Sequence, residues 1–269
     1  MTGVDDAGLE LMLTELRLPT MRQLWRKFAE QSDTEGWPAS RLLSVLAEHE
    51  LAERDRRRVQ RHLSEARLLP GKSLAGFDFS AVPTISKARV MALAAGDAWL
   101  DQGACCLIFG PPGTGKSHIA SAIGLALVEN GYRVLYCRTT DLVQRLQTAR
   151  RELALEAMLA RLDRHHLLIL DDFAYVRKDQ AETSVLFELI SARYERRSLM
   201  ITANQPFGEW GRIFPDETTA VAAVDRLVHR ATILEMNVES FRRREALQAG
   251  PRKRGRPASR ATEKNTPTS

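Results

Sequence analysis

The chain has 269 residues, 44% of them hydrophobic, and a net charge of +5, enough for one domain of ordinary size with a smaller one beside it. No apolar run approaches the ~20 residues that span a membrane, and the acidic start MTGVDDAGLE lacks the apolar region of a signal peptide. These features exclude a membrane protein and predict a cytoplasmic one. Cys105, Cys106 and Cys137 show neither a disulfide framework nor metal-ligand spacing and are interpreted as core residues.

Residues 9–69 carry apolar side chains at three- and four-residue spacing, which predicts helices throughout and a helical N-terminal domain over residues 1–69. The last of these helices places four guanidinium groups on one face, from Arg54, Arg57, Arg58 and Arg61. Asp55 and Glu65 are expected to offset little of that charge. A solvated helix face and a contact with nucleic-acid phosphates explain this stripe equally well.

Residues 70–101 form a connector in which turns precede a single predicted helix from Ser86 to Asp101. Strands and helices alternate over residues 102–249, which predicts an α/β fold with a parallel five-stranded sheet flanked by helices. The predicted strands are Cys105–Phe109, Arg133–Arg138, Leu167–Asp171, Leu199–Ala203 and Thr232–Met236.

The stretch IFGPPGTGKSHIA, residues 108–120, matches the phosphate-binding loop between a strand and a helix. Its glycines let successive N–H groups point inward, and the start of the helix adds a positive dipole, so a nucleoside triphosphate is the expected ligand. Lys116 is expected to reach the β- and γ-phosphates, and the Ser117 hydroxyl to hold Mg²⁺. The residues expected at the nucleotide are Gly110, Pro111, Pro112, Gly113, Thr114, Gly115, Lys116, Ser117 and His118.

Two acidic residues and an amide follow later strands. Asp171 ends the apolar strand of HHLLILDDF, where a carboxylate is needed beside bound Mg²⁺, and Asp172 is placed to orient or deprotonate the attacking water. Asn204 ends LMITAN and would face the γ-phosphate if its strand lies between the loop strand and the Asp171 strand. No Asn-Lys-x-Asp segment argues for guanine, so ATP is the expected nucleotide.

The positive charge is concentrated in residues 250–269, where six Lys or Arg face one Glu, so the remaining 249 residues are neutral overall. Abundant Pro, Ser, Thr and Gly predict that this tail is disordered. The unit KRGRP places Arg254 and Arg256 around a glycine, which is similar to the core of an AT-hook that enters an A·T-rich minor groove. A solvated tail with no specific role is about as well supported.

Five longer segments together resemble the IstB-like ATP-binding proteins, the AAA+ helpers of insertion-sequence transposition, which are related to DnaC-type helicase loaders. The resemblance covers residues 9–245. It rests on RHLSEARLLPGKSLAGFDF, GPPGTGKSHIASAIGLAL, LLILDDFAYVRKDQAETSVLFELISARYERRS, ITANQPFGEW and AVDRLVHRATILEMNVESFRRR. It implies a P-loop NTPase fold of AAA+ type, ATP and Mg²⁺ as cofactors, and self-association into an ATP-dependent oligomer.

Carried over to this sequence, the resemblance makes Lys116 and Ser117 the Walker A pair, and Asp171 and Asp172 the Walker B pair. It makes Asn204 sensor 1, Arg226 the arginine finger that completes a neighbouring subunit's site, and Arg242 sensor 2. An alternative for Arg226 is a local ion pair with Asp225. Scarcely ten residues separate Arg242 from the tail, so the helical lid is expected to be reduced or absent. An aspartate in place of the commoner glutamate at 172 predicts slow intrinsic hydrolysis.

Two main functions follow from the resemblance. One is a transposition helper that assembles on duplex DNA with ATP, deforms it and presents it to a transposase. The other is a DnaC-like replicative helicase loader, whose main partner is a hexameric helicase. A DNA-binding switch that uses ATP only for assembly is a third. The N-terminal region and the basic tail favour the transposition helper.

Overall fold

The computed structural model describes residues 6–173, 179–205, 217–238 and 240. The predictions for Arg242, Arg254, Arg256 and the basic tail therefore lie outside the described residues. Within that part of the chain, none of the helices is both long enough and apolar enough to cross a membrane.

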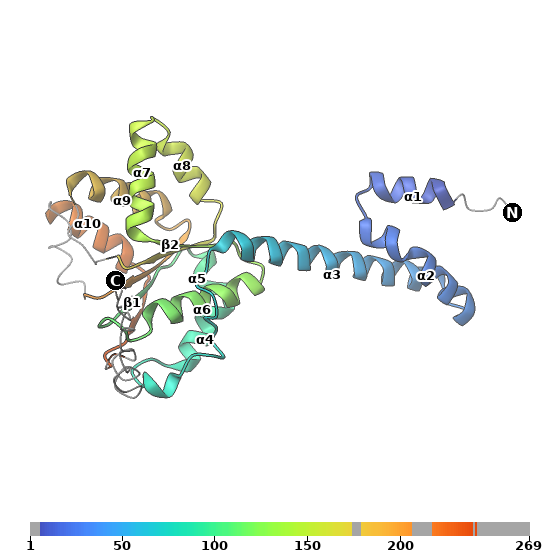
Figure 1. Ribbon diagram of the computed structural model, residues 1–269, viewed down its shortest axis with the longest axis horizontal. Coiled ribbons are helices and arrows are strands. Elements are labelled where there is room, and N and C mark those ends of the chain that lie inside the picture. The colour runs from blue at the N-terminus through green and yellow to red at the C-terminus, as the bar shows by residue number, and fades with distance from the viewer. Residues whose placement is uncertain (1–5, 174–178, 206–216, 239, 241–269) are drawn as a thin grey trace, which may run out of the picture.

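The N-terminal region is helical, as its periodicity predicts. It contains α1 (Asp6–Glu15), α2 (Pro19–Glu35) and α3 (Ala39–Ala66). Proline at the first turn of α2 and a left-handed Gly36 at its end mark that helix clearly. Helix α3 runs outward from the sheet and carries α1 and α2 at its far end (Figure 1). At the near end Ala66 is buried among residues that cover the sheet, so α3 joins the two parts of the molecule.

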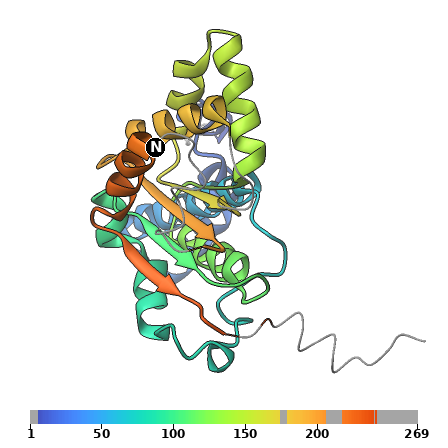
Figure 2. The same ribbon diagram turned by 90° about the vertical axis from the view of Figure 1, so that its left-hand side faces the viewer.

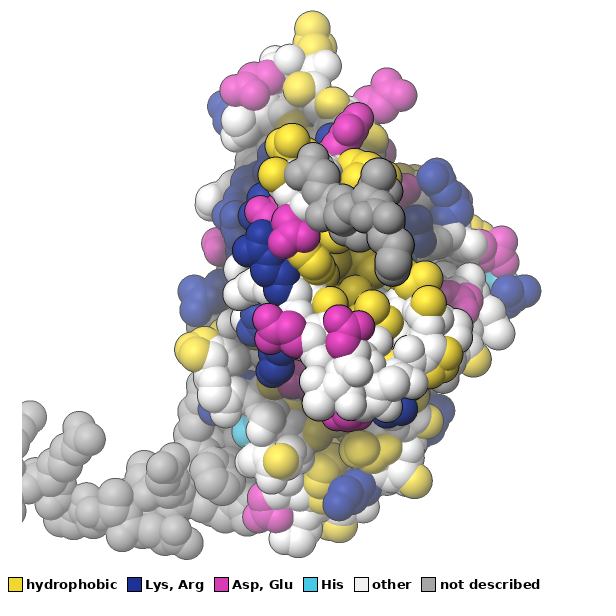
Figure 3. Space-filling model, turned by 90° about the vertical axis from the view of Figure 1, so that its right-hand side faces the viewer, with side chains coloured by type: hydrophobic (Ala, Val, Ile, Leu, Met, Phe, Trp, Pro, Cys, Tyr) yellow, Lys and Arg dark blue, Asp and Glu magenta, His cyan; other side chains and the backbone are white. Residues whose placement is uncertain are grey.

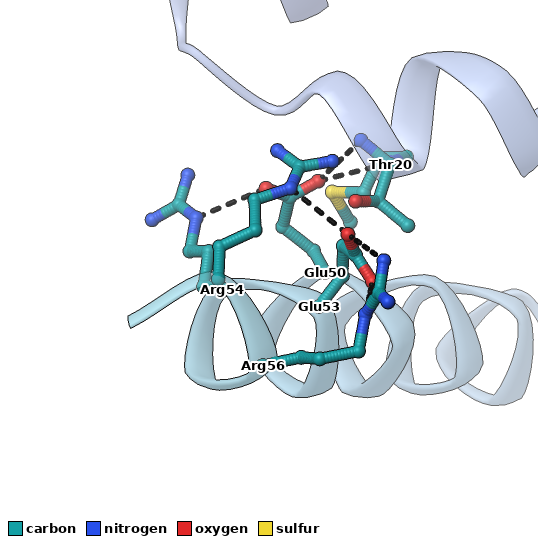
Figure 4. Close-up of polar contacts among 7 residues, drawn as sticks. Thr20, Glu50, Glu53, Arg54 and Arg56 are labelled. Atoms are coloured by element: carbon teal, nitrogen blue, oxygen red, sulfur yellow. Dashed lines mark hydrogen bonds and ion pairs between the residues drawn. The ribbon is translucent and has the colours of Figure 1, made fainter. Parts of the chain in front are cut away.

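A buried carboxylate joins α2 to α3. Glu50 of α3 accepts hydrogen bonds from the backbone N–H groups of Thr20 at 2.7 Å and Met21 at 3.1 Å, in the first turn of α2 (Figure 4). Arg54 donates to the other carboxylate oxygen at 2.9 Å. Glu50 therefore caps a helix to which it does not belong, and its negative charge lies at the positive end of that helix.

The connector contains a short 3₁₀ turn, η1 (Phe79–Ala81), and two helices, α4 (Lys87–Ala95) and α5 (Asp97–Asp101). The single helix predicted from Ser86 to Asp101 is therefore wrong. The chain bends at Gly96, which has a φ of 89°, a conformation that glycine adopts at little cost. A Cβ there would lie 2.6 Å from Leu127 and 2.7 Å from Tyr132, so the close approach to these two side chains also requires glycine.

All five predicted strands are present, with ends that differ from prediction by one residue at most. They are β1 (Cys106–Phe109), β2 (Val134–Arg138), β3 (Leu167–Asp171), β4 (Ser198–Ala203) and β5 (Thr232–Glu235). They form one parallel sheet in the order β2-β3-β4-β1-β5. The condition stated for Asn204 is met, because β4 lies between β3 and β1.

Helices cover both faces of this sheet (Figure 2). The helices between the strands are α6 (Lys116–Glu129), α7 (Thr139–Arg151), α8 (Leu155–Leu162), α9 (Gln180–Arg193) and α10 (Glu217–Val228). One hydrophobic cluster joins the sheet to α4, α6 and the end of α3. The other joins it to α7, α9 and α10. Every residue of β3 and β4 is buried, as central parallel strands require.

Candidate nucleotide-binding site

The loop between β1 and α6 has the shape that its glycines predict. Gly113 and Gly115 have φ values of 83° and 99°, which glycine adopts about as readily as negative ones. A Cβ at Gly115 would lie 3.2 Å from the ring of Phe77. Inside the loop, the Thr114 hydroxyl donates to the carbonyl of Pro111 at 3.0 Å. The first turn of α6 follows at Lys116, so its N–H groups face the loop as an anion site.

The Lys116 ammonium lies across this loop. Its Nζ donates to the carbonyl oxygens of Gly110 at 2.7 Å and Pro111 at 2.9 Å, and the side chain is 6% exposed. A buried ammonium beside the N-terminus of a helix favours a polyanionic ligand. The side chain of His118 instead faces the connector, where Nε2 lies 3.3 Å from the Ser73 carbonyl oxygen and the ring contacts Phe77.

The Asp171 carboxylate lies beside Ser117, as predicted for a magnesium site. The Ser117 hydroxyl donates to Oδ1 of Asp171 at 2.9 Å. The same oxygen accepts from the Thr202 hydroxyl at 2.5 Å, and Oδ2 accepts from the Tyr136 hydroxyl at 2.5 Å. A carboxylate and a hydroxyl are the hard oxygen donors that Mg²⁺ uses, so these residues fit that ion.

Sequence reasoning missed Tyr136 and Thr202. Burial raises the pKa of Tyr136, and the neighbouring Asp171 carboxylate raises it further, so the phenol stays a hydrogen-bond donor at neutral pH. The only sequence feature that could have indicated them is a hydroxyl-bearing residue in a mostly apolar strand, Tyr136 in VLYCR and Thr202 in LMITA. Only the order of the strands shows that both hydroxyls meet the same carboxylate.

Asp172 and Asn204 lie at the same edge of the sheet as the loop. Asp172 has a φ of 56°, an uncommon left-handed conformation for this residue type, and its N–H donates to the Thr202 hydroxyl at 3.0 Å. Asn204 directly follows β4 and is half-buried. The carboxyl ends of β1, β3 and β4 thus bring the predicted loop, carboxylates and amide together, at the edge where ligands bind in open α/β sheets.

Arg226 lies at the opposite edge of the sheet. With Gly103 and Leu199, at the amino ends of β1 and β4, it lines a pocket. Its guanidinium donates to the Ala222 carbonyl of its own helix at 2.9 Å and lies 4.9 Å from the centre of the Phe187 ring. Among the described contacts there is no ion pair with Asp225, the sequence-based alternative.

The four arginines of the predicted stripe on α3 are less free than predicted. Arg54 pairs with Glu50 at 2.9 Å, Arg57 with Glu53 at 2.9 Å, and Arg58 with Asp55 at 3.2 Å. The expectation that Asp55 offsets little of this charge is wrong, because Asp55 pairs with Arg58. Glu50 and Glu53, which that expectation did not count, each lie one helical turn before an arginine. These three side chains are still about half exposed, and Arg61 is also exposed. Lys and Arg gather along one side of this end of the molecule, with acidic side chains among them (Figure 3).

The phosphate loop, the Asp171 carboxylate and a sheet with β4 between β1 and β3 define a P-loop NTPase of AAA+ type. AMPPCP-bound DnaA from Aquifex aeolicus shares this fold, with a TM-score of 0.53 and 18% identity over 64% of this chain and 52% of that one. The crystal structure of DnaI does so with a TM-score of 0.52 and 16% identity, over 62% and 92% of the two chains. The chain belongs to the family of IstB-like ATP-binding proteins, whose model matches residues 11–249.

Relatives from insertion sequences match over most of their length. An insertion sequence ATP-binding protein of Sinorhizobium fredii is 70% identical over 97% of this chain and 88% of its own. The ATP-binding protein of insertion sequence IS21 from Pseudomonas aeruginosa is 34% identical over 90% and 91% of the two chains. The protein is therefore an ATP-binding AAA+ protein of the insertion-sequence type, as the sequence resemblance implied.

Proposed function

We propose that this protein hydrolyses ATP, assembles on duplex DNA in its ATP-bound state, and presents that DNA to the transposase of its insertion sequence. The contact between Ser117 and Asp171 at 2.9 Å beside the buried Lys116 is the observation that carries the ATPase part. The relatives are named after insertion sequences, which supports the transposition part.

Each site residue has a distinct part in this proposal. Lys116 binds the β- and γ-phosphates in place of the loop carbonyls that it now contacts. Ser117 and Asp171 hold Mg²⁺, which when bound neutralises charge on the phosphates. Asp172 orients or deprotonates the attacking water, and Asn204 senses the γ-phosphate from the neighbouring strand end. An aspartate reaches less far than a glutamate, so basal hydrolysis is expected to be slow.

Arg226 acts on a neighbouring subunit. It lies at the amino edge of the sheet, whereas its own phosphate loop lies at the carboxyl edge, so it reaches no phosphate bound to its own chain. A finger supplied from a second copy would stabilise the charge that develops during phosphoryl transfer. ATP would then favour the oligomer through its higher affinity for the assembled state.

Duplex DNA is bound through phosphates. The half-exposed arginines of α3 are suited to contacts of this kind, because guanidinium groups on one helix face can follow a phosphate backbone. Binding through such contacts is largely independent of base sequence and weakens as salt concentration rises. Each neutralised phosphate contributes about −0.9 to the slope of log affinity against log salt concentration. The basic tail is proposed to add affinity on A·T-rich duplexes.

Nucleotide binding and turnover separate the roles of the loop and of Asp172. Lys116→Ala should abolish ATP binding, whereas Asp172→Asn should bind ATP and lose steady-state hydrolysis. Lys27→Ala and Asp225→Asn, both at exposed positions, are the matched controls and should leave binding and turnover unchanged. Full turnover by Asp172→Asn would contradict the role of that carboxylate.

Assembly tests Arg226. Light scattering with ATP and duplex DNA should show an oligomer for the wild-type protein and a smaller species for Arg226→Ala. Arg230→Ala removes an exposed arginine from the same pocket and should assemble normally. Unchanged assembly together with unchanged turnover in Arg226→Ala would make Arg226 a structural residue.

Duplex affinity measured against salt concentration tests DNA binding. Replacing the four stripe arginines, Arg54, Arg57, Arg58 and Arg61, with glutamine should weaken binding on all sequences and flatten the salt slope. Arg56→Gln is the control for Arg57→Gln, since both arginines bind Glu53 but only Arg57 belongs to the stripe. Deleting residues 250–269 should cost affinity mainly on A·T-rich DNA. A preference for single strands, or duplex binding only with a helicase present, would favour the helicase-loader function.

A further inference from the structure

Two strands that flank β3 supply hydroxyl groups to Asp171. Thr202 on β4 donates to Oδ1 and Tyr136 on β2 donates to Oδ2, each at 2.5 Å. Thr202 is completely buried and Tyr136 is 6% exposed. Both carboxylate oxygens are therefore bound from within the core, on opposite sides of the strand that carries the acid.

The register of the sheet creates this arrangement. Tyr136 and Met200 both lie opposite Ile169. Alternate residues of a strand share a face, so Asp171, two residues after Ile169, lies on the same face as Tyr136. Thr202, two residues after Met200, lies on that face too. The first turn of α6, which carries Ser117, covers this face of the sheet.

The two hydroxyl groups constrain the carboxylate in different ways. A hydroxyl has one proton to donate and two lone pairs. Thr202 donates its proton to Asp171 and accepts the N–H of Asp172 at 3.0 Å, so it contacts both acidic residues. Tyr136 donates to Oδ2 of Asp171 and also hydrogen-bonds the Ser117 side chain. Loss of the phenol hydroxyl should therefore act on the Ser117–Asp171 pair, whereas loss of the threonine hydroxyl should also free the backbone N–H of Asp172.

We propose that Tyr136 and Thr202 are positioning residues for the Mg²⁺ that accompanies ATP: they hold the Asp171 carboxylate in the orientation that Ser117 and the ion require. This inference rests on the proposed function of Asp171 as a magnesium ligand. Groups that hold a metal ligand in place commonly change metal affinity by about 10- to 100-fold when they are removed. The two residues touch the ligand and not the ion, so their effect should be visible in binding before any turnover is measured.

The test is the Mg²⁺ concentration needed for tight binding of a fluorescent ATP analogue to the full-length chain. Tyr136→Phe should raise the half-maximal Mg²⁺ concentration by about 10-fold and leave the affinity without Mg²⁺ unchanged. Thr202→Val should raise it similarly and slow turnover as well, whereas Thr202→Ser keeps the hydroxyl and should restore the wild-type value. Tyr194→Phe is the control, because it removes a tyrosine hydroxyl that contacts His229 at 2.9 Å in an exposed position.

A merely structural role would lower the thermal unfolding midpoint of the variants without changing their Mg²⁺ dependence. That result in both Tyr136→Phe and Thr202→Val would overturn the proposal while leaving the magnesium site intact. If wild-type binding showed no Mg²⁺ dependence, both this inference and the assignment of Asp171 as a metal ligand would be wrong. If Tyr136→Phe fails to fold, the half-maximal Mg²⁺ concentrations of Thr202→Val and Thr202→Ser test the proposal, and equal values for the two variants would overturn it.

Discussion

The outer helices, α1 and α2, are stabilised by different interactions from those that stabilise the nucleotide-binding sheet. Helix α1 has no buried residue, and the buried residues of α2 are the polar Thr20 and Ser32. Strands β3 and β4 are buried along their whole length and are mostly apolar. Since hydrophobic stabilisation grows with the apolar area removed from water, the sheet region should be much the more stable. The outer helices depend more on a few polar contacts, chiefly those of Glu50.

The sheet region also has one polar anchor, and its removal should have the largest effect. Arg193 is 1% exposed, and its guanidinium donates to the carbonyls of Leu162, His165, His166 and Ser198. Burial lowers the pKa of Arg193 to about 10, so it remains charged at neutral pH. Arg193→Met should lower the free energy of unfolding by about 3–5 kcal/mol, measured by urea denaturation.

Arg196→Met is the control for that measurement. Arg196 pairs with the same Asp163 as Arg193, but its side chain is 69% exposed. Its loss should change the free energy of unfolding by less than about 1 kcal/mol. Equal effects of the two substitutions would show that burial of the guanidinium does not matter.

Loss of Glu50 should destabilise the outer helices and spare the sheet. Glu50→Ala leaves the N–H groups of Thr20 and Met21 without their acceptor, at a cost of about 1–3 kcal/mol. Amide hydrogen exchange should accelerate in α2 and remain unchanged in β3. Glu53→Ala, which removes only exposed ion pairs, should have a smaller effect. Faster exchange in β3 would mean that the two regions unfold together.

The same carboxylate should make the outer helices sensitive to acid. Burial alone would raise the pKa of Glu50, but the N–H groups of Met21 and Thr20 and the Arg54 guanidinium outweigh it, so the pKa is lowered. A lowered pKa gives stability that is present above the unfolded value of about 4.3 and is lost as pH falls through the folded value. The difference between wild type and Glu50→Gln in the protection of α2 amides from hydrogen exchange should therefore become smaller below that pH. A difference that does not change with pH would show that the charge of Glu50 does not stabilise α2.

Cysteine labelling should report on the sheet region, where Cys105, Cys106 and Cys137 all lie, and show whether it depends on the outer helices. Burial raises the pKa of Cys105 to about 11 and that of Cys106 to about 12, and Cys137 is shifted in the same way. The thiols should stay protonated and react slowly at pH 8. Arg193→Met should speed labelling, whereas Glu50→Ala should leave the rate unchanged. Equal acceleration in the two variants would show that the outer helices protect the sheet.

The strands and the phosphate loop could be predicted because each depends on a local pattern. Apolar runs bounded by turns marked the strands, and the loop glycines have the conformations that their motif requires. The break at Gly96 could not be predicted, because it depends on contacts with Leu127 and Tyr132, which only the folded chain brings close. A glycine within a helical pattern is otherwise tolerated.

The polar partners of the functional residues were harder to predict. Glu50 and Glu53 lie within reach of arginines on the same helix, and counting only Asp55 and Glu65 overlooked them. Tyr136 and Thr202 lie in strands whose sequences are mostly apolar, so their hydroxyls gave no clear indication of a functional role. Their joint contact with Asp171 depends on the register of three strands, which no single segment of sequence contains.

The long reach of α3 affects how the protein moves through solution. Its 28 residues extend about 42 Å at the usual rise per residue. A compact chain of 269 residues has a radius of gyration of about 18 Å, so the helix alone is more than twice as long as that radius. A monomer with such an arm experiences more drag than a sphere of equal mass, so it sediments slowly and elutes early from a sizing column. Its molar mass is therefore better determined by light scattering than from sedimentation velocity or elution volume.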